Sequence, residues 1–201
     1  MSIDIWLAFS LFAFVTSVTP GPNNIMLLAS GVNFGFRASI PHILGISSGL
    51  LVMVVAAGLG LTEVFARYPF SYTAMRWLGV AYMLYLAWRI ANSGALKAKS
   101  AGGPGGRPLG FWSAAAFQWV NPKAWFMAIG AFSTYVPAAS SVAIVVSVAV
   151  LFALINAPRV SVWAAFGAQM RRFIQVPRFQ RIFNYTMAAL LVASLVPLLS
   201  S

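Results

Sequence analysis

Amide side chains stand next to prolines in the middle of apolar sequence at the segment Pro20-Gly21-Pro22-Asn23-Asn24. Proline has no backbone N–H and blocks the helical hydrogen bond to the carbonyl four residues earlier. In hydrocarbon each freed carbonyl costs several kcal/mol unless protein, water or a solute satisfies it. The helix that follows such a break presents a positive N-terminal end, which suits a carboxylate. We therefore expect these five residues to bind a small polar solute; a packing kink healed by neighbouring helices is the alternative.

A second break carries a charge, in Asn121-Pro122-Lys123. A lysine near the middle of an apolar run costs at least about 3 kcal/mol on insertion scales. The two acids of the chain, Asp4 and Glu63, lie near the ends of apolar runs and are not expected to pair with it. Lys123 should therefore face carbonyls, water or the anionic group of a solute. The alternative is a lysine that reaches the membrane surface.

The pattern of amide, proline and cation recurs once more, in Asn156-Ala157-Pro158-Arg159. Asn156 and Arg159 are added to the predicted solute site, although Arg159 lies only about 10 Å, or two helical turns, from the end of its apolar run and could equally reach the surface. The single histidine, His42, is interpreted as an interfacial hydrogen-bonding residue, with proton coupling as the alternative.

These residues must be positioned by membrane helices. The chain has 201 residues, of which 61% are hydrophobic and only 7% are charged. Soluble domains normally carry about 25% charged residues, so this chain could not cover a globule with solvated surface. The formal charge of +11 comes from short connections between apolar runs, which indicates a membrane orientation signal and not a nucleic-acid site. No cysteine is present, and we expect no metal, cofactor or nucleic-acid partner.

Six apolar runs are expected to span the bilayer, since each span needs roughly 20 residues. They lie near residues 4–31, 40–62, 70–91, 110–133, 140–166 and 182–199. The Gly- and Pro-rich stretch within 93–109 is expected to be a linker. It divides one transport domain, residues 1–201, into a first repeat (about 1–92) and a second (about 110–201). Three spans per half make the halves inverted, and each half opens with a proline-broken span, which is the sequence pointer to inverted-repeat transporters. A five-span arrangement is the main alternative.

Basic residues set the expected orientation. The connections after the first, third and fifth spans, with their helix ends, contain Arg37, Arg89, Lys97, Lys99, Arg107, Arg171, Arg172, Arg178 and Arg181. The connections after the second and fourth spans contain only Arg67 and Arg76. The odd connections are therefore predicted to be cytoplasmic and both termini to lie outside.

The first break, continued by Gly31, Gly35-Phe36-Arg37, Gly45 and Gly49, resembles the N-terminal signature of the LysE/RhtB amino-acid exporters. Phe111-Trp112, Phe117-Gln118 and Val120-Asn121-Pro122-Lys123 are similar to the fourth span of the same family, and look closest to the cysteine and O-acetylserine exporters. The resemblance implies a bacterial inner-membrane exporter driven by a proton or sodium gradient. Several relatives carry an acid in the fifth span, where this chain has Asn156 and Ala157, and that difference leaves the proton carrier undetermined.

We expect an exporter of small neutral, zwitterionic amino acids or derivatives, such as cysteine, O-acetylserine, threonine or homoserine. The expected partners are this solute, the lipid bilayer and the coupling ion, with a homo-oligomer left open. A non-transporting membrane scaffold is one alternative. An intramembrane enzyme is another, although His42 with Ser47 or Ser48 is its only candidate base and nucleophile, so no enzymatic activity is expected.

Overall fold

The computed structural model describes residues 1–93, 107–137, 140–174 and 176–196. Every regular element in these ranges is a helix, which confirms the all-α prediction. The helices are α1 (Ile3–Val18), α2 (Pro22–Phe34), α3 (Phe36–Ala56), the π-helix η1 (Ala57–Leu61), α4 (Thr62–Arg67), α5 (Pro69–Ala91), α7 (Phe111–Val120), α8 (Pro122–Tyr135), α9 (Val142–Met170) and α10 (Pro177–Ala193). Most of the predicted linker, with Lys97 and Lys99, lies outside the described residues.

Both proline-rich segments break a helix, as predicted. α1 and α2 meet at an angle of 53° across Thr19, Pro20 and Gly21. Pro22 is the first residue of α2, where a missing N–H is not needed for helical bonding. α7 ends at Val120 and α8 begins at Pro122, with extended backbone at Asn121 between them. Neither half of either pair is long enough to cross a bilayer by itself.

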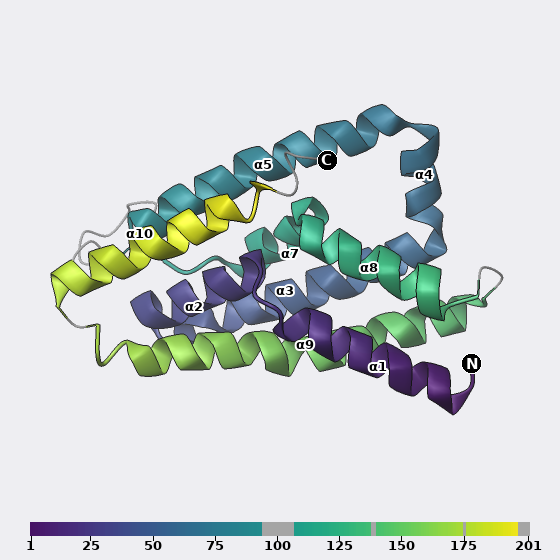
Figure 1. Ribbon diagram of the computed structural model, residues 1–201, viewed down its shortest axis with the longest axis horizontal. Coiled ribbons are helices and arrows are strands. Elements are labelled where there is room, and N and C mark those ends of the chain that lie inside the picture. The colour runs from purple at the N-terminus through teal and green to yellow at the C-terminus, as the bar shows by residue number, and fades with distance from the viewer. Residues whose placement is uncertain (94–106, 138–139, 175, 197–201) are drawn as a thin grey trace.

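The prolines inside the longer helices do not break them. Pro41 lies inside α3 and Pro158 inside α9, and both helices continue past them. α3 instead ends in the π-helix η1, where Gly60 has φ of 103°, a left-handed value that favours glycine. The chain then turns through α4 into α5 (Figure 1).

Glycines let the central helices approach at backbone distance. A Cβ at Gly45 would meet the Phe111 carbonyl of α7, and one at Gly49 would lie 2.6 Å from Cα of Ala115. The Gly45–Gly49 pair therefore lets the backbones of α3 and α7 pack directly against each other. The closest pairing of all was not predicted: a Cβ at Gly31 would meet the backbone of Ala164, and one at Gly167 would meet the carbonyl of Leu28. α2 and α9 therefore cross with no side chain between them.

Two layers result from this packing (Figure 1). α2, α3 and α9 lie together, with α7 against α3 and α1 against α9. α5 and α10 lie side by side and cover the other side of α2 and α7. The buried side chains form two clusters, one around Leu27, Ile46 and Phe117 and the other around Phe9, Met53 and Phe152.

Two single helices, Phe36–Leu61 and Val142–Met170, are long and apolar enough to cross a membrane. The bent pair α1–α2 makes a third span if it is counted as one. α5 has the length, but its arginines and its Tyr and Trp side chains lower its hydropathy. The membrane character of the chain is therefore supported, while the count of six spans stays a prediction.

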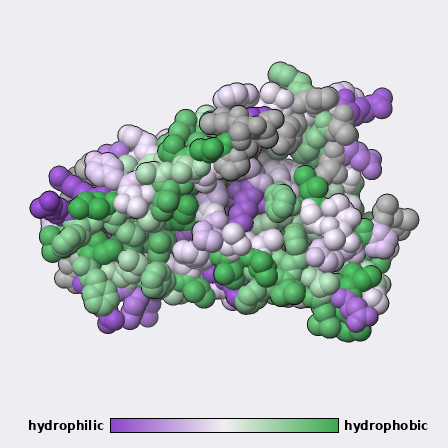
Figure 2. All heavy atoms as spheres, in the orientation of Figure 1, coloured by the Kyte–Doolittle hydropathy of each residue, from purple (hydrophilic) through white to green (hydrophobic). Residues whose placement is uncertain are grey.

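The connections fall at two opposite ends of the molecule. Figure 1 shows the α2–α3 and α9–α10 connections and the end of α5 at the left, and the α3–α5 and α8–α9 connections at the right. Exposed arginines mark the left end: Arg37, Arg171, Arg172, Arg178 and Arg181. Figure 2 shows hydrophilic side chains gathered at both ends and in a patch near the middle of a mostly apolar face. This distribution fits a molecule whose long axis crosses a bilayer.

Candidate functional site

The two helix breaks meet in the middle of the fold. Asn23 of α2 and Gln118 of α7 exchange hydrogen bonds through their side-chain amides, at 2.8 Å from Asn23 Nδ2 to Gln118 Oε1 and 3.2 Å from Gln118 Nε2 to Asn23 Oδ1. The Lys123 ammonium donates to the carbonyl of Thr19, which is the last residue before Pro20. The cation of the second break is therefore bound to a carbonyl of the first.

A cavity opens between these breaks, with α3 and α9 completing its wall. Its lining consists of Thr16, Ser17, Gly21, Asn23, Asn24, Leu50, Gln118, Asn121, Lys123, Ala124, Met127, Asn156 and Val160. The centre of a water molecule can occupy about 20 Å³ of it. One bound water needs about 10–15 Å³ on this measure. The cavity in this conformation is therefore too small for a whole amino acid.

Asn24 repairs the first break. It is 3% exposed, and its Nδ2 lies 3.0 Å from the carbonyl of Thr19 and 3.3 Å from that of Ser17. These carbonyls belong to the end of α1, where the prolines remove the usual backbone donors. The Asn24 amide nitrogen thus satisfies carbonyls of its own break, whereas its neighbour Asn23 bonds across to the other break.

Asn121 has the equivalent place in the second break. It is 1% exposed and is the N-cap of α8, where its Oδ1 accepts a hydrogen bond of 3.1 Å from the backbone N–H of Lys123. An asparagine side chain at this position satisfies one of the open donors at a helix start. The cap fixes the first turn of α8, and with it the direction in which the Lys123 side chain leaves the helix.

Two further polar atoms that line the cavity have no hydrogen-bond partner among the described residues. They are Ser17 Oγ and Asn156 Nδ2, and both residues are at least 96% buried. A buried polar group without a partner is costly, and native proteins rarely keep one without a reason. These atoms can donate to, or in the case of Ser17 also accept from, a polar solute.

Four of the ten residues predicted for the site do not line the cavity. Pro20, Pro22 and Pro122 shape the backbone of the breaks but have no place in the lining. Arg159 points elsewhere, because its guanidinium lies 3.2 Å from the centre of the Phe14 ring on α1. The other six, Gly21, Asn23, Asn24, Asn121, Lys123 and Asn156, come together from three helices and the connections between them.

The prediction omitted three polar residues of the lining, Thr16, Ser17 and Gln118. Gln118 is fully buried and Ser17 is 3% exposed. Gln118 lies three residues before Asn121, and Ser17 lies three before Pro20, so each stands in the last turn of the helix that precedes a predicted break. That spacing is the signal which could have identified them.

The cavity is cationic. Among the described residues that line it Lys123 is the only charged one, and the acids Asp4 and Glu63 are both exposed. No group of three or more His, Cys, Asp or Glu residues that could hold a metal ion occurs in the described ranges. His42 and Ser47, considered as an enzymatic pair, do not bond to each other: Ser47 Oγ donates to the carbonyl of Ile43 at 3.0 Å.

Comparison with known proteins identifies the family of the chain. Residues 14–200 match the family model described as LysE type translocator. The chain belongs to the LysE family. This membership confirms the resemblance of the two motifs and assigns the chain to the transporters and not to the enzymes.

Curated relatives in the LysE family match over nearly their whole length. A cysteine/O-acetylserine efflux protein of Klebsiella pneumoniae subsp. pneumoniae is 36% identical over 189 residues, which cover 92% of each chain. A protein of the same name from Escherichia coli (strain K12) is 35% identical over 194 residues, or 96% of each chain. No solved structure matches the chain significantly.

Proposed function

We propose that this LysE-family protein exports small neutral amino acids or their acylated derivatives, with cysteine and O-acetylserine as the first candidates. The observation that carries the proposal is the Lys123 ammonium, which lies at a largely buried cavity whose lining has amides and hydroxyls but no carboxylate. The names of the relatives supply the candidate solutes.

The charges of a zwitterion suit this lining. Its carboxylate would replace the Thr19 carbonyl as the partner of Lys123, in a charge-assisted bond stronger than the bond to a neutral carbonyl. Its ammonium would lie among oxygens, with Ser17 Oγ and the released Thr19 carbonyl as acceptors. Asn156 Nδ2 would donate to the carboxylate or to an acyl carbonyl. The roles of Gly21, Asn23, Asn24 and Asn121 would be to shape and line the site.

The small size of the cavity implies a conformational cycle. The site must widen to take up an amino acid, and the two inverted repeats, about residues 1–92 and 110–201, would rock against each other to open it to either side. The helix pairs α3–α9 and α5–α10 support this, because an inverted repeat maps each of these contacts onto itself. The two broken helices, α1–α2 and α7–α8, occupy corresponding places in the two halves.

For the membrane arrangement, we infer six spans in the bacterial inner membrane, with the arginine-rich end in the cytoplasm and both termini outside. The energy source would be a proton or sodium gradient. Because an exporter takes up its solute from the cytoplasm, the solute would enter at the arginine-rich end.

Purified protein in liposomes tests the function. With unlabelled cysteine or O-acetylserine inside and a trace of the labelled compound outside, an exchanger accumulates label, and the label is recovered as unchanged solute. Empty liposomes and liposomes loaded with glucose are the controls. Absence of accumulation for both compounds and for serine, threonine and homoserine would reject the proposed solute class.

A further inference from the structure

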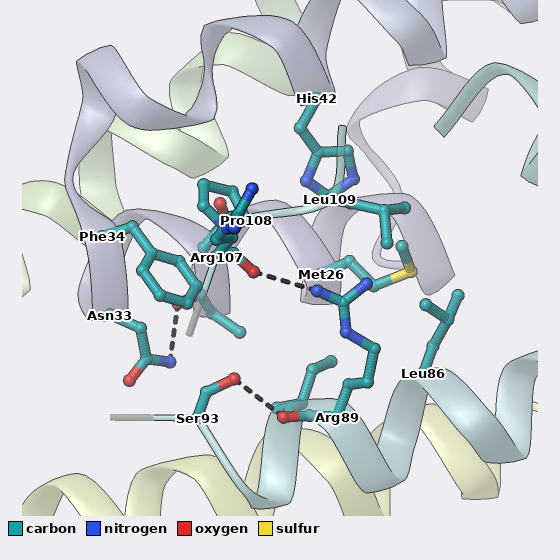
Figure 3. Close-up of a pocket in the computed structure, with 13 residues that line it drawn as sticks. Met26, Asn33, Phe34, His42, Leu86, Arg89, Ser93, Arg107, Pro108 and Leu109 are labelled. Atoms are coloured by element: carbon teal, nitrogen blue, oxygen red, sulfur yellow. Dashed lines mark hydrogen bonds between the residues drawn. The ribbon is translucent and has the colours of Figure 1, made fainter. Parts of the chain in front are cut away.

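A second polar cavity lies at the arginine-rich end of the fold. It is formed between α2, α3, α5 and the segment before α7, and Ser30, Asn33, His42, Arg89 and Arg107 supply its polar lining (Figure 3). The centre of a water molecule can occupy about 40 Å³ of it, twice the space in the central cavity. That space is about three waters, or one carboxylate group, on the measure used above.

His42 is the residue that the fold leaves unexplained. It is 2% exposed, and neither ring nitrogen has a hydrogen-bond partner in the described part of the chain. An imidazole always carries at least one N–H donor, so a buried ring without a partner is costly. Figure 3 shows the ring extending from α3 into the cavity. The hydrogen bonds expected of an interfacial histidine are not found among the described residues, because the side chain is buried within the helix bundle.

Arg89 brings a positive charge into the same cavity. It enters from α5, and one of its terminal nitrogens donates to the carbonyl of Arg107 at 3.0 Å. Figure 3 shows the guanidinium directed into the cavity that receives His42. A guanidinium has five N–H donors in a planar fork that matches a carboxylate. No aspartate or glutamate is among the residues that line this cavity.

A hydrogen-bond network holds the α2 side of the cavity rigid. Asn33 Nδ2 donates to Asn184 Oδ1 of α10 at 2.8 Å, and Asn33 Oδ1 accepts from Gln180 Nε2 at 3.1 Å. Asn184 Nδ2 in turn donates to the carbonyl of Ser93, 2.5 Å away at the end of α5. These amides are satisfied by one another, so they fix the walls of the cavity into which His42 and Arg89 extend.

The second cavity lies in line with the central one. α2 contributes Asn33 to it and Asn24 to the central cavity, and α3 contributes His42 and Leu50 respectively. At the rise of an α-helix these spacings amount to about 12–14 Å. Leu27 and Ile46, both fully buried, lie on these stretches of α2 and α3 and belong to one apolar cluster with Phe117 of α7. The two cavities are thus separate chambers divided by apolar packing.

We propose that the cavity of His42 and Arg89 is an entry site that binds the carboxylate of the solute before the solute reaches Lys123. The inference rests on the proposed export function and on the orientation that places this end in the cytoplasm. His42 and Arg89 donate hydrogen bonds to the carboxylate oxygens, and the apolar layer opens for the next step. An inorganic anion has similar chemistry, and the test separates the two sources.

The cysteine-free chain permits a test by thiol protection. A single reporter, Ser93→Cys, lies on the wall of the cavity, with Leu109→Cys as a second reporter should the first alter efflux. Labelling by a small charged methanethiosulfonate is followed at increasing O-acetylserine. Serine amide, chloride and phosphate are the comparison ligands. The proposal expects protection by O-acetylserine in the Lys123→Met background as well, and weak protection by serine amide and by the inorganic anions.

Variants of the two ligands complete the test. His42→Leu should raise the half-protecting concentration at least about tenfold, the effect of losing a hydrogen bond to a charged group. His42→Gln, which keeps an N–H donor, should restore part of the lost affinity. Arg89→Gln should act like His42→Leu. A reporter at Ser141, at the opposite end of the fold, should show no protection.

The failures are distinguishable. If wild-type protein exchanges O-acetylserine in liposomes but neither reporter is protected, the entry site is rejected and the export function stands. Equal protection by chloride, phosphate and O-acetylserine also rejects it, in favour of an inorganic anion site. Loss of protection in Lys123→Met would show that only the central site binds. If wild-type protein exchanges none of the solutes, the export function itself fails.

Discussion

Asn23 and Gln118 are 95 positions apart in the chain and bond to each other in both directions, each amide donating to the other. The pair joins the start of α2, after the first helix break, to the end of α7, before the second. The two helix breaks are thereby held next to each other at the central cavity. The pair also stands where the two proposed repeats meet.

Removal of either amide should therefore stop efflux without loss of the protein. Asn23→Ala leaves the Gln118 amide buried without this partner, and Gln118→Ala does the same to Asn23, at about 1–3 kcal/mol each. Each single variant should reach the membrane at normal abundance with efflux reduced at least about tenfold. The double variant should be little worse than either single one, because the two share one interaction.

Cellular efflux assays with an immunoblot of the membrane fraction measure both quantities. Thr186→Ala, an exposed position on α10, is the matched control and should behave as wild type. Efflux at the wild-type rate in both single variants would remove the pair from the solute site.

A methyl group at Gly21 should displace Lys123. A Cβ at this position would lie 2.6 Å from Lys123 Cδ and 3.2 Å from its Nζ. The neighbour is a flexible side chain and not backbone, so we expect Gly21→Ala to fold and to lose efflux. Gly110→Ala is the control, since a Cβ there meets nothing within 4 Å. Normal efflux in Gly21→Ala would show that the position of Lys123 is unimportant.

The α2–α9 crossing should tolerate no added volume. In Gly167→Ala the new methyl group would overlap the Leu28 carbonyl, and the neighbouring backbone has nowhere to move. Overpacking of this kind costs about 1–3 kcal/mol, so the melting temperature in detergent should fall by several degrees relative to Gly110→Ala. An unchanged melting temperature would contradict the close approach of these helices.

The orientation can be tested with cysteines at the two ends of the molecule. Ala38, at the start of α3, and Ser141, just before α9, are both exposed and lie at opposite ends. In intact cells an impermeant maleimide should label Ser141→Cys and not Ala38→Cys, and both should be labelled after permeabilisation. Labelling of Ala38→Cys alone in intact cells would invert the proposed orientation.

The sequence sufficed to locate the helix breaks and five of the eight polar residues of the central lining. Proline has a local effect on the backbone, so Pro22 and Pro122 could be identified as break points without any tertiary information. Asparagines beside such breaks must find partners in an apolar medium, which is why Asn23, Asn24 and Asn121 were selected.

The sequence could not show which side chains face a cavity once the helices are packed. Asn156 and Arg159 occur in one motif and are close enough in the helix to share a face, but only Asn156 lines the cavity and Arg159 stacks on Phe14. The packing of α1 on α9 decides which of the two meets the cavity. In the sequence Arg89 served only as one of the basic residues that predict the membrane orientation. Its place in the cavity of His42 depends on how α5 lies across α2 and α3. Single-chain patterns carry no information on such contacts between distant helices.

The central claim is that Lys123 binds the carboxylate of the exported amino acid. A cargo with a second positive charge would bring a cation close to this ammonium in a poorly screened site, where like charges repel by several kcal/mol. Counterflow in liposomes with labelled serine, cysteine, threonine, leucine, lysine and arginine measures the consequence directly. The account predicts exchange of the small neutral amino acids, little exchange of lysine and arginine, and at least about tenfold slower exchange in Lys123→Met with partial recovery in Lys123→Arg. Preferred exchange of lysine or arginine, or undiminished exchange in Lys123→Met, would contradict it.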